Sequence, residues 1–165
     1  FNSWYSERAM SYRDYYDISH EYGTAAIIQK MVFGNLNEKS CTGVLFSRDC
    51  ISGKKGIIGE FLPKAQGEDV VSGAVTPLNI SELKAFNPTA YNQLVSIAEN
   101  LEKTTGDIQD IEFTIEDGNL YILQKRKAVC SSIAQSNLLK ELVKENTLSE
   151  KDYIEQIKVE QLLEK

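Results

Sequence analysis

The sequence predicts an α+β fold with a mixed or antiparallel sheet and helices against one face. The first observation is alternation of apolar and polar residues on both sides of a turn between residues 110 and 126, the pattern of a β-hairpin. The second is another pair of strand-like runs, residues 42–48 and 55–62, joined by a turn. The third is helical periodicity over residues 88–105, expected to cover the sheet, and again after Ser131.

The hairpin between residues 110 and 126 carries four polar side chains, and the length of its loop determines whether they lie on the same face. A two-residue loop, Asp117-Gly118, would place Glu112 opposite Leu123, because a shift of one residue turns a strand's side chains to the other face. A three-residue loop that ends at a left-handed Gly118 places all four on one face. Both registers bury the apolar residues, and the chemistry favours the three-residue loop. The four residues are Asp110, Glu112, Gln124 and Arg126.

The chemistry of that shared face suits a metal-bound polyphosphate. Carboxylate and amide oxygens are ligands for Mg²⁺, which usually takes one or two from protein, so Glu112 and Gln124 are the predicted metal ligands. Arg126 would neutralise phosphoryl oxygens during transfer, and Asp110 is the second predicted catalytic residue. Spacing alone leaves open the alternative of a solvated polar face on a half-buried hairpin.

Composition and charge argue against several classes of function. A net charge of −6 argues against a nucleic-acid surface, and against this chain holding a whole triphosphate pocket by itself. No apolar run of transmembrane length and no signal-like segment is present, so we expect a cytoplasmic protein without a membrane partner. The cysteines lack metal-ligand spacing and are odd in number, so we expect reduced thiols with no disulfide or zinc site at Cys41, Cys50 and Cys130.

The N-terminal stretch predicts a helix and then a strand. The helix is expected from about Glu7 to Tyr16, with Ser6 as its N-cap and the aromatic residues around it engaged in packing. His20, the only histidine, is expected in an exposed loop without a second titratable partner. Residues 24–33 are small, β-branched and apolar, the composition of a buried strand.

Five sequence blocks follow one another through nearly the whole chain. They are GTA with QKMVFGN at 23–35, TGVLFSRD at 42–49, GEFL at 59–62, AQGEDVVSG at 65–73, and DIEFTI with LQ and R at 110–126. Together they resemble the ATP-grasp domain of the pyruvate, phosphate dikinase family. Phosphoenolpyruvate synthases share the hairpin pattern, whereas the AQGEDVV block resembles the dikinase version. Cys50 and Ser47 depart from the family's proline and threonine, which affects the turn and leaves the cleft intact.

The resemblance implies a division of the chain and a set of nucleotide contacts. Residues 1–129 would be the C-terminal part of an ATP-grasp nucleotide-binding domain, and residues 130–165 a helical linker towards a phosphohistidine domain. Composition alone makes residues 63–77 a solvated connector, whereas the resemblance makes them an ordered loop beside the nucleotide. By analogy, the adenine side is lined by Gln29, Met31 and Val32, the polyphosphate meets Thr42, and Glu68 and Asp69 contribute to loop closure or docking.

The parent enzyme implied by the resemblance converts ATP, phosphate and pyruvate into AMP, pyrophosphate and phosphoenolpyruvate. It uses Mg²⁺ and a carrier histidine, and it is expected to be a homodimer. This chain would hold part of the first site, would be inactive alone, and would have the remaining domains as partners. The alternatives are a non-catalytic interaction module that kept the fold, or a fragment of a ligase. The four hairpin residues argue against the first alternative, and the AQGEDVV block argues against the second.

Overall fold

The protein is described by a computed structural model that covers residues 1–72 and 75–163, with side chains over residues 1–69 and 75–156. The chain divides into two compact units, Phe1–Met31 and Val32–Lys165. Within the described residues, no helix has the length and apolar character that a membrane span requires.

The first unit is built on one helix. A short 3-10 helix, Asn2–Tyr5, precedes α1, Glu7–Tyr15, and the Ser6 hydroxyl accepts a hydrogen bond from the Ala9 backbone N–H at 3.3 Å. The predicted helix and its N-cap are therefore confirmed. Arg13 is buried, and its guanidinium carbon lies 4.0 Å from the centroid of the Trp4 ring, a cation–π contact that fixes the helix against the preceding turn.

Two expectations for the first unit hold only in part. The aromatic residues pack locally, as in the pair Tyr12 and Tyr16 with ring centroids 4.5 Å apart, but they form no buried core, and Tyr5 and Tyr15 are 74% and 82% exposed. His20 lies in an exposed turn, as expected, but it does have titratable neighbours, because this turn folds back on α1. Its Nδ1 accepts from Arg13 Nε at 3.0 Å, and its Nε2 lies 2.7 Å from Asp14 Oδ1.

The expected buried strand at residues 24–33 is also wrong. This stretch has no regular secondary structure, and Ile27 and Ile28 are 88% and 98% exposed. A strand needs a neighbour for its backbone hydrogen bonds, and none of the strands in the described residues pairs with this run. Apolar composition is therefore not sufficient here to bury the segment.

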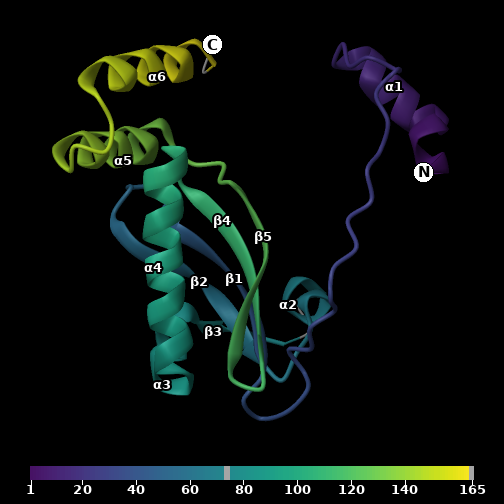
Figure 1. The fold of residues 1–165 in the computed structure, drawn as a ribbon, viewed down its shortest axis with the longest axis vertical. Coiled ribbons are helices and arrows are strands. Elements are labelled where there is room, and N and C mark those ends of the chain that lie inside the picture. Colours follow the sequence, from purple (N-terminus) through teal and green to yellow (C-terminus); the bar gives the residue numbers. More distant parts are fainter. Residues whose placement is uncertain (73–74, 164–165) are drawn as a thin grey trace. The chain divides into compact units, whose positions relative to one another are not determined.

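The second unit contains a five-stranded sheet with the order β3-β2-β1-β4-β5, in which every neighbouring pair is antiparallel (Figure 1). The fold is thus α+β, as expected, and the two hairpins β1–β2 and β4–β5 are confirmed. The strands are β1, Cys41–Arg48; β2, Lys55–Pro63; β3, Leu78–Asn79; β4, Gln109–Glu116; and β5, Asn119–Lys127.

The longest helix, α4, Pro88–Thr105, runs along one face of the sheet (Figure 1). Asn87 caps its start by accepting from the Ala90 N–H at 3.0 Å, and Gly106 ends it in the left-handed conformation at φ 72°. The start at Pro88 and the end at Gly106 are confirmed. The other helices are α2, Gly67–Ser72; a 3-10 turn, Ile80–Glu82; α3, Leu83–Phe86; α5, Ser132–Lys144; and α6, Glu150–Leu163.

The main core lies between α4 and the sheet. Strand residues at every second position meet the buried side of the helix, so one face of the sheet is apolar while the hairpin's polar residues occupy the other. A smaller core around Ile108 and Leu138 packs α5 against the end of the sheet where β4 begins and β5 ends. The main cluster is Cys41, Leu45, Phe61, Ile80, Leu83, Ala90, Leu94, Ala98, Ile111, Phe113 and Ile115.

The expectation of three reduced thiols is wrong for two of them. Cys50, in the turn after β1, forms a disulfide with Cys130, just before α5, across 80 residues of sequence. Their Cα atoms are 4.5 Å apart because the β1–β2 turn lies against the start of α5, a proximity that sequence spacing does not contain. Cys41 is free and buried.

A buried ion pair joins the sheet to two helices. Arg48, 2% exposed, donates to both carboxylate oxygens of Glu102 at 2.8 and 2.7 Å and to Glu141 at 3.1 Å. Burial by itself would lower the pKa of Arg48, but the hydrogen bonds and negative charge of Glu102 and Glu141 outweigh it and raise the pKa, so the guanidinium remains charged. The pair therefore links β1 to α4 and α5.

Substitution Glu102→Ala should lower the free energy of unfolding by about 3 kcal/mol, because it leaves the Arg48 charge buried with one carboxylate fewer. Glu99→Ala on the same helix is the matched control, since its Lys55 pair is half-exposed at 3.6 Å, and it should cost under about 1 kcal/mol. Urea denaturation followed by circular dichroism measures both. Equal losses for the two variants would contradict a structural role for the buried pair.

Candidate functional site

The turn of the β4–β5 hairpin differs from the prediction. Glu116 pairs with Asn119, so the loop contains two residues, Asp117 and Gly118, and both have positive φ, 46° and 82°. This is the geometry in which a two-residue hairpin turn matches the twist of its strands, and aspartate followed by glycine adopts it readily. The expected three-residue loop is wrong.

The predicted facing of the polar side chains is nevertheless confirmed, because a β-bulge restores it. The pairing shifts between Glu112 and Phe113. Phe113 lies opposite Ile122 and Glu112 opposite Gln124, so Leu123 is the extra residue of the bulge. Without the bulge, Glu112 would face Leu123. We call the surface formed by Asp110, Glu112, Gln124 and Arg126 the hairpin face.

Side-chain contacts within the hairpin face pair its members across the strands. Arg126 Nε donates to Asp110 Oδ2 at 2.7 Å, and Gln124 Nε2 donates to Glu112 Oε1 at 3.4 Å. The Asp110 side chain is 14% exposed and that of Arg126 64%, so the carboxylate anchors a guanidinium that reaches outward. The hydrogen bond to Asp110 and its charge raise the pKa of Arg126, which keeps the residue cationic.

The hairpin face offers hard oxygen donors but not a complete metal cage. Glu112 supplies a carboxylate, and Gln124 could supply its amide oxygen if the amide turned over. Within the described part of the chain, no three His, Cys, Asp or Glu residues are grouped closely enough to hold a metal ion. This donor set fits Mg²⁺, which takes few protein ligands and completes its shell with water and phosphate oxygens.

Thr42 lies on the same sheet face as Glu112 but is enclosed. It pairs with Thr114, two residues from Glu112, and is 3% exposed. Its hydroxyl donates to the Phe113 carbonyl at 3.1 Å and lies 3.1 Å from the Thr114 hydroxyl. In this structure the Thr42 hydroxyl therefore bonds within the sheet rather than presenting itself to a ligand.

The two adjacent acids Glu68 and Asp69 lie in the first turn of α2, which contacts β1 and β2. Both are exposed, and Asp69 Oδ2 accepts from the Gln66 backbone N–H at 2.7 Å. This part of the AQGEDVVSG block is thus helical rather than an irregular connector. The last residue of the block, Gly73, lies outside the described residues.

The residues expected on the adenine side belong to different units. Gln29 and Met31 are exposed in the irregular segment of the first unit, and Val32, 8% exposed, begins the second. Their contact with adenine stays a prediction.

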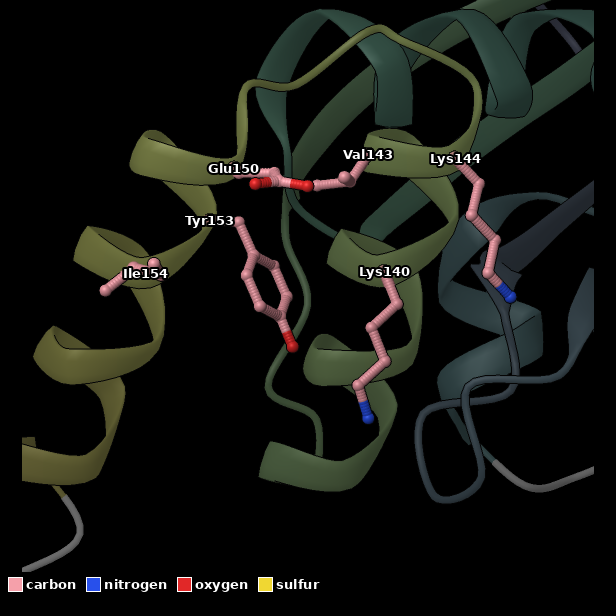
Figure 2. A pocket seen from close by; sticks show the side chains of 6 residues that line it. All are labelled: Lys140, Val143, Lys144, Glu150, Tyr153 and Ile154. Carbon is pink, nitrogen blue, oxygen red and sulfur yellow. The ribbon is translucent and has the colours of Figure 1, made fainter.

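A cavity of about 380 Å³ lies between α5 and α6, and sequence reasoning did not anticipate it (Figure 2). Figure 2 shows the Tyr153 ring and Ile154 on α6 and Val143 and Lys140 on α5, so apolar and charged side chains both line it. None of the predicted site residues lines it. It is separate from the hairpin face.

Comparison with known proteins identifies related sequences. Residues 1–85 and 79–147 match the family described as pyruvate phosphate dikinase, AMP/ATP-binding domain. Over 97% of its length the chain is 46% identical to a pyruvate, phosphate dikinase of Rickettsia prowazekii, and over 98% it is 44% identical to that of Clostridium symbiosum. A chloroplastic pyruvate, phosphate dikinase of Mesembryanthemum crystallinum is 44% identical over 88% of the chain. The chain spans 19%, 18% and 15% of the length of these relatives.

The register of the hairpin face can be tested by cross-linking. In a chain whose native cysteines are replaced (Cys41→Ala, Cys50→Ser, Cys130→Ser), the pair Glu112→Cys and Gln124→Cys should form a disulfide, because directly opposed residues have adjacent Cβ atoms. The matched pair Glu112→Cys and Leu123→Cys should not. Mass spectrometry of peptides after mild oxidation measures both, and preferential linkage at residue 123 would contradict the bulge.

Proposed function

Because the chain belongs to the family of pyruvate phosphate dikinase AMP/ATP-binding domains, we propose that it forms the phosphate-facing part of an ATP-grasp nucleotide site. The observation that carries the proposal is the hairpin face, where Asp110 pairs with Arg126 and Glu112 pairs with Gln124. One surface thereby offers oxygen donors for a cation and a guanidinium for phosphoryl oxygens. ATP is the proposed nucleotide.

Within a longer protein, this site would serve the first half of the pyruvate, phosphate dikinase reaction. ATP and inorganic phosphate would react there while a carrier histidine of another domain receives a phosphoryl group, which later passes to pyruvate. The products would be AMP, pyrophosphate and phosphoenolpyruvate. A homodimeric assembly and a cytoplasmic location are part of the same proposal, as is a linker role for residues 130–165.

In this proposal Glu112 and Gln124 hold Mg²⁺ together with phosphate oxygens of the nucleotide. The metal would neutralise charge on the polyphosphate and help to fix its orientation. Glu112 is partly exposed on the face of the sheet opposite α4, and Gln124 would need to direct its amide oxygen towards the ion. Their cross-strand pairing keeps both donors at one point of the hairpin.

Arg126 is the proposed catalytic residue, and its contact with Asp110 gives the two residues different roles. The short hydrogen bond uses Arg126 Nε, so the terminal nitrogens of the guanidinium keep N–H groups with which they can donate to phosphoryl oxygens. Asp110, the second predicted catalytic residue, is proposed to act by positioning the guanidinium, since its side chain is only 14% exposed and accepts from Arg126 Nε at 2.7 Å. The cation would stabilise charge that redistributes over the phosphoryl group during transfer.

The remaining predicted residues would contribute around this centre. Glu68 and Asp69 are proposed to act in docking or closure of the other subdomain through α2, which contacts the same sheet. A phosphate contact by Thr42 would require its hydroxyl to exchange its bond with the Phe113 carbonyl. Gln29, Met31 and Val32 are proposed for the adenine side. With a net charge of −6, the chain needs further cations from elsewhere in the parent protein.

The isolated chain should bind Mg-ATP weakly, because most of the cationic partners for the triphosphate are absent. We expect a dissociation constant near the millimolar range, which corresponds to a favourable binding free energy of about 4 kcal/mol. It should not turn ATP over. Isothermal titration calorimetry measures the affinity, and micromolar binding would show that the chain by itself supplies most of the site.

In a full-length enzyme that contains this sequence, Arg126→Ala should lower the single-turnover rate of histidine phosphorylation by about a hundredfold or more while changing ATP affinity little. Glu112→Ala should both weaken nucleotide binding and slow transfer, since the metal bridges phosphate oxygens in ground and transition states. Quench-flow with labelled ATP separates the rate from the affinity.

The matched control for Arg126→Ala is Lys125→Ala, the neighbouring exposed cation that alternation directs to the other side of β5. It should leave the phosphorylation rate within about twofold of the original. Transfer from a pre-phosphorylated carrier to pyruvate should survive all three substitutions. Loss of that second half-reaction with ATP cleavage intact would place the hairpin face in the wrong site.

A further inference from the structure

The Cys50–Cys130 disulfide joins two segments that the backbone already holds together. The Ser131 N–H donates to the Cys50 carbonyl at 2.9 Å, and the Ser131 hydroxyl donates to the Ile51 carbonyl at 2.6 Å. Further along α5, Asn137 Nδ2 donates to the Ser52 carbonyl at 2.9 Å. These contacts would keep the two sulfurs adjacent whether or not they are bonded.

The β1–β2 turn is also packed closely against α5. At Gly53, with φ 72°, a Cβ atom would lie 2.7 Å from the Ala134 carbonyl oxygen, so the turn approaches the helix as only glycine allows. The Gly53 carbonyl in turn accepts from Arg48 Nη1 at 3.1 Å, and the same nitrogen contacts Glu141 on α5. The disulfide therefore reinforces the attachment of α5 to the end of β1.

The three cysteines differ in how far reagents can reach them. Cys50 and Cys130 are each partly exposed at the margin of the smaller core. Cys41 is fully buried between the sheet and α4, and burial raises its pKa to about 12, so it offers almost no thiolate at neutral pH. Oxidation of the folded chain should thus be confined to the Cys50–Cys130 pair.

We propose that Cys50 and Cys130 form a redox-sensitive clamp that fixes α5 to the sheet when oxidised and loosens it when reduced. The oxidant would be a small-molecule disulfide. One protein thiolate attacks it and releases one small thiol, and the other protein thiolate then attacks the mixed disulfide at the protein sulfur and releases the second. Two protein thiols lose two electrons and two protons, and the oxidant gains both as two thiols.

The clamp would act on the junction between the nucleotide-binding sheet and the C-terminal helices. In the reduced chain, α5 would remain attached through Ser131, Asn137 and the apolar contacts around Leu138, none of which is covalent. Local unfolding or detachment of α5 would then become more frequent, because no disulfide links residues 50 and 130. Redox state would thereby set how firmly the nucleotide-binding sheet holds these helices.

The test compares the full 165-residue chain after treatment with oxidised glutathione and after treatment with dithiothreitol. Peptide mapping by mass spectrometry should find a Cys50–Cys130 linkage only after oxidation. The melting temperature should be higher by roughly 5–10 °C in the oxidised chain, and amide hydrogen exchange in α5 should be slower. Cys50→Ser and Cys130→Ser should each abolish both differences, and Cys41→Ala should preserve them.

Two results would overturn the proposal. One is a folded chain, judged by circular dichroism, in which oxidised glutathione produces no linkage and both cysteines remain open to alkylation. The other is a linkage that changes neither the melting temperature nor exchange in α5. If a serine variant fails to fold, the oxidised and reduced forms of the unsubstituted chain still decide between these outcomes.

Discussion

The pairing of β4 with β5, shifted by the bulge at Leu123, is the constraint on which the hairpin face depends. Successive side chains of a strand point to opposite faces of the sheet. The extra residue, Leu123, therefore determines the face on which Gln124 and Arg126 lie. Before the bulge, Leu120 packs on the α4 side with the main core. After the bulge, Gln124 and Arg126 contact the acids of β4 on the opposite face. One register thus serves both packing and chemistry.

Contacts at the end of the sheet away from the β4–β5 turn also stabilise this register. Arg48 lies at the end of β1, next to the strand that carries Asp110 and Glu112, and its bidentate contact with Glu102 holds α4 over the sheet. Ser47 adds to this network by donating to Glu102 at 2.6 Å and accepting from the Gln109 N–H at the start of β4. The strand that supplies the two acids is therefore anchored where it begins, which limits movement of its side chains.

The sequence was informative where local physics decides the structure, and less so where distant contacts do. The start of α4 at Pro88 and its end at Gly106 follow from local backbone preferences, and the two hairpins follow from alternation. The turn length was misjudged because the correct facing could come from either a longer loop or a bulge, and alternation does not distinguish them. The exposure of residues 24–31 and the joining of Cys50 to Cys130 depend on which segments meet in space, and no local pattern contains that information.

Paramagnetic broadening by Mn²⁺ tests most directly whether the hairpin face is a metal–nucleotide site. Mn²⁺ replaces Mg²⁺ at oxygen-ligand sites, and trace amounts broaden nearby amide signals even when binding is weak. With ATP present, the account predicts selective loss of the Glu112 and Gln124 amide signals, retention of the Leu138 signal on α5, and no selective loss in Glu112→Ala. Broadening centred on Glu68 and Asp69, or unchanged by Glu112→Ala, would contradict the assignment of the metal to the hairpin face.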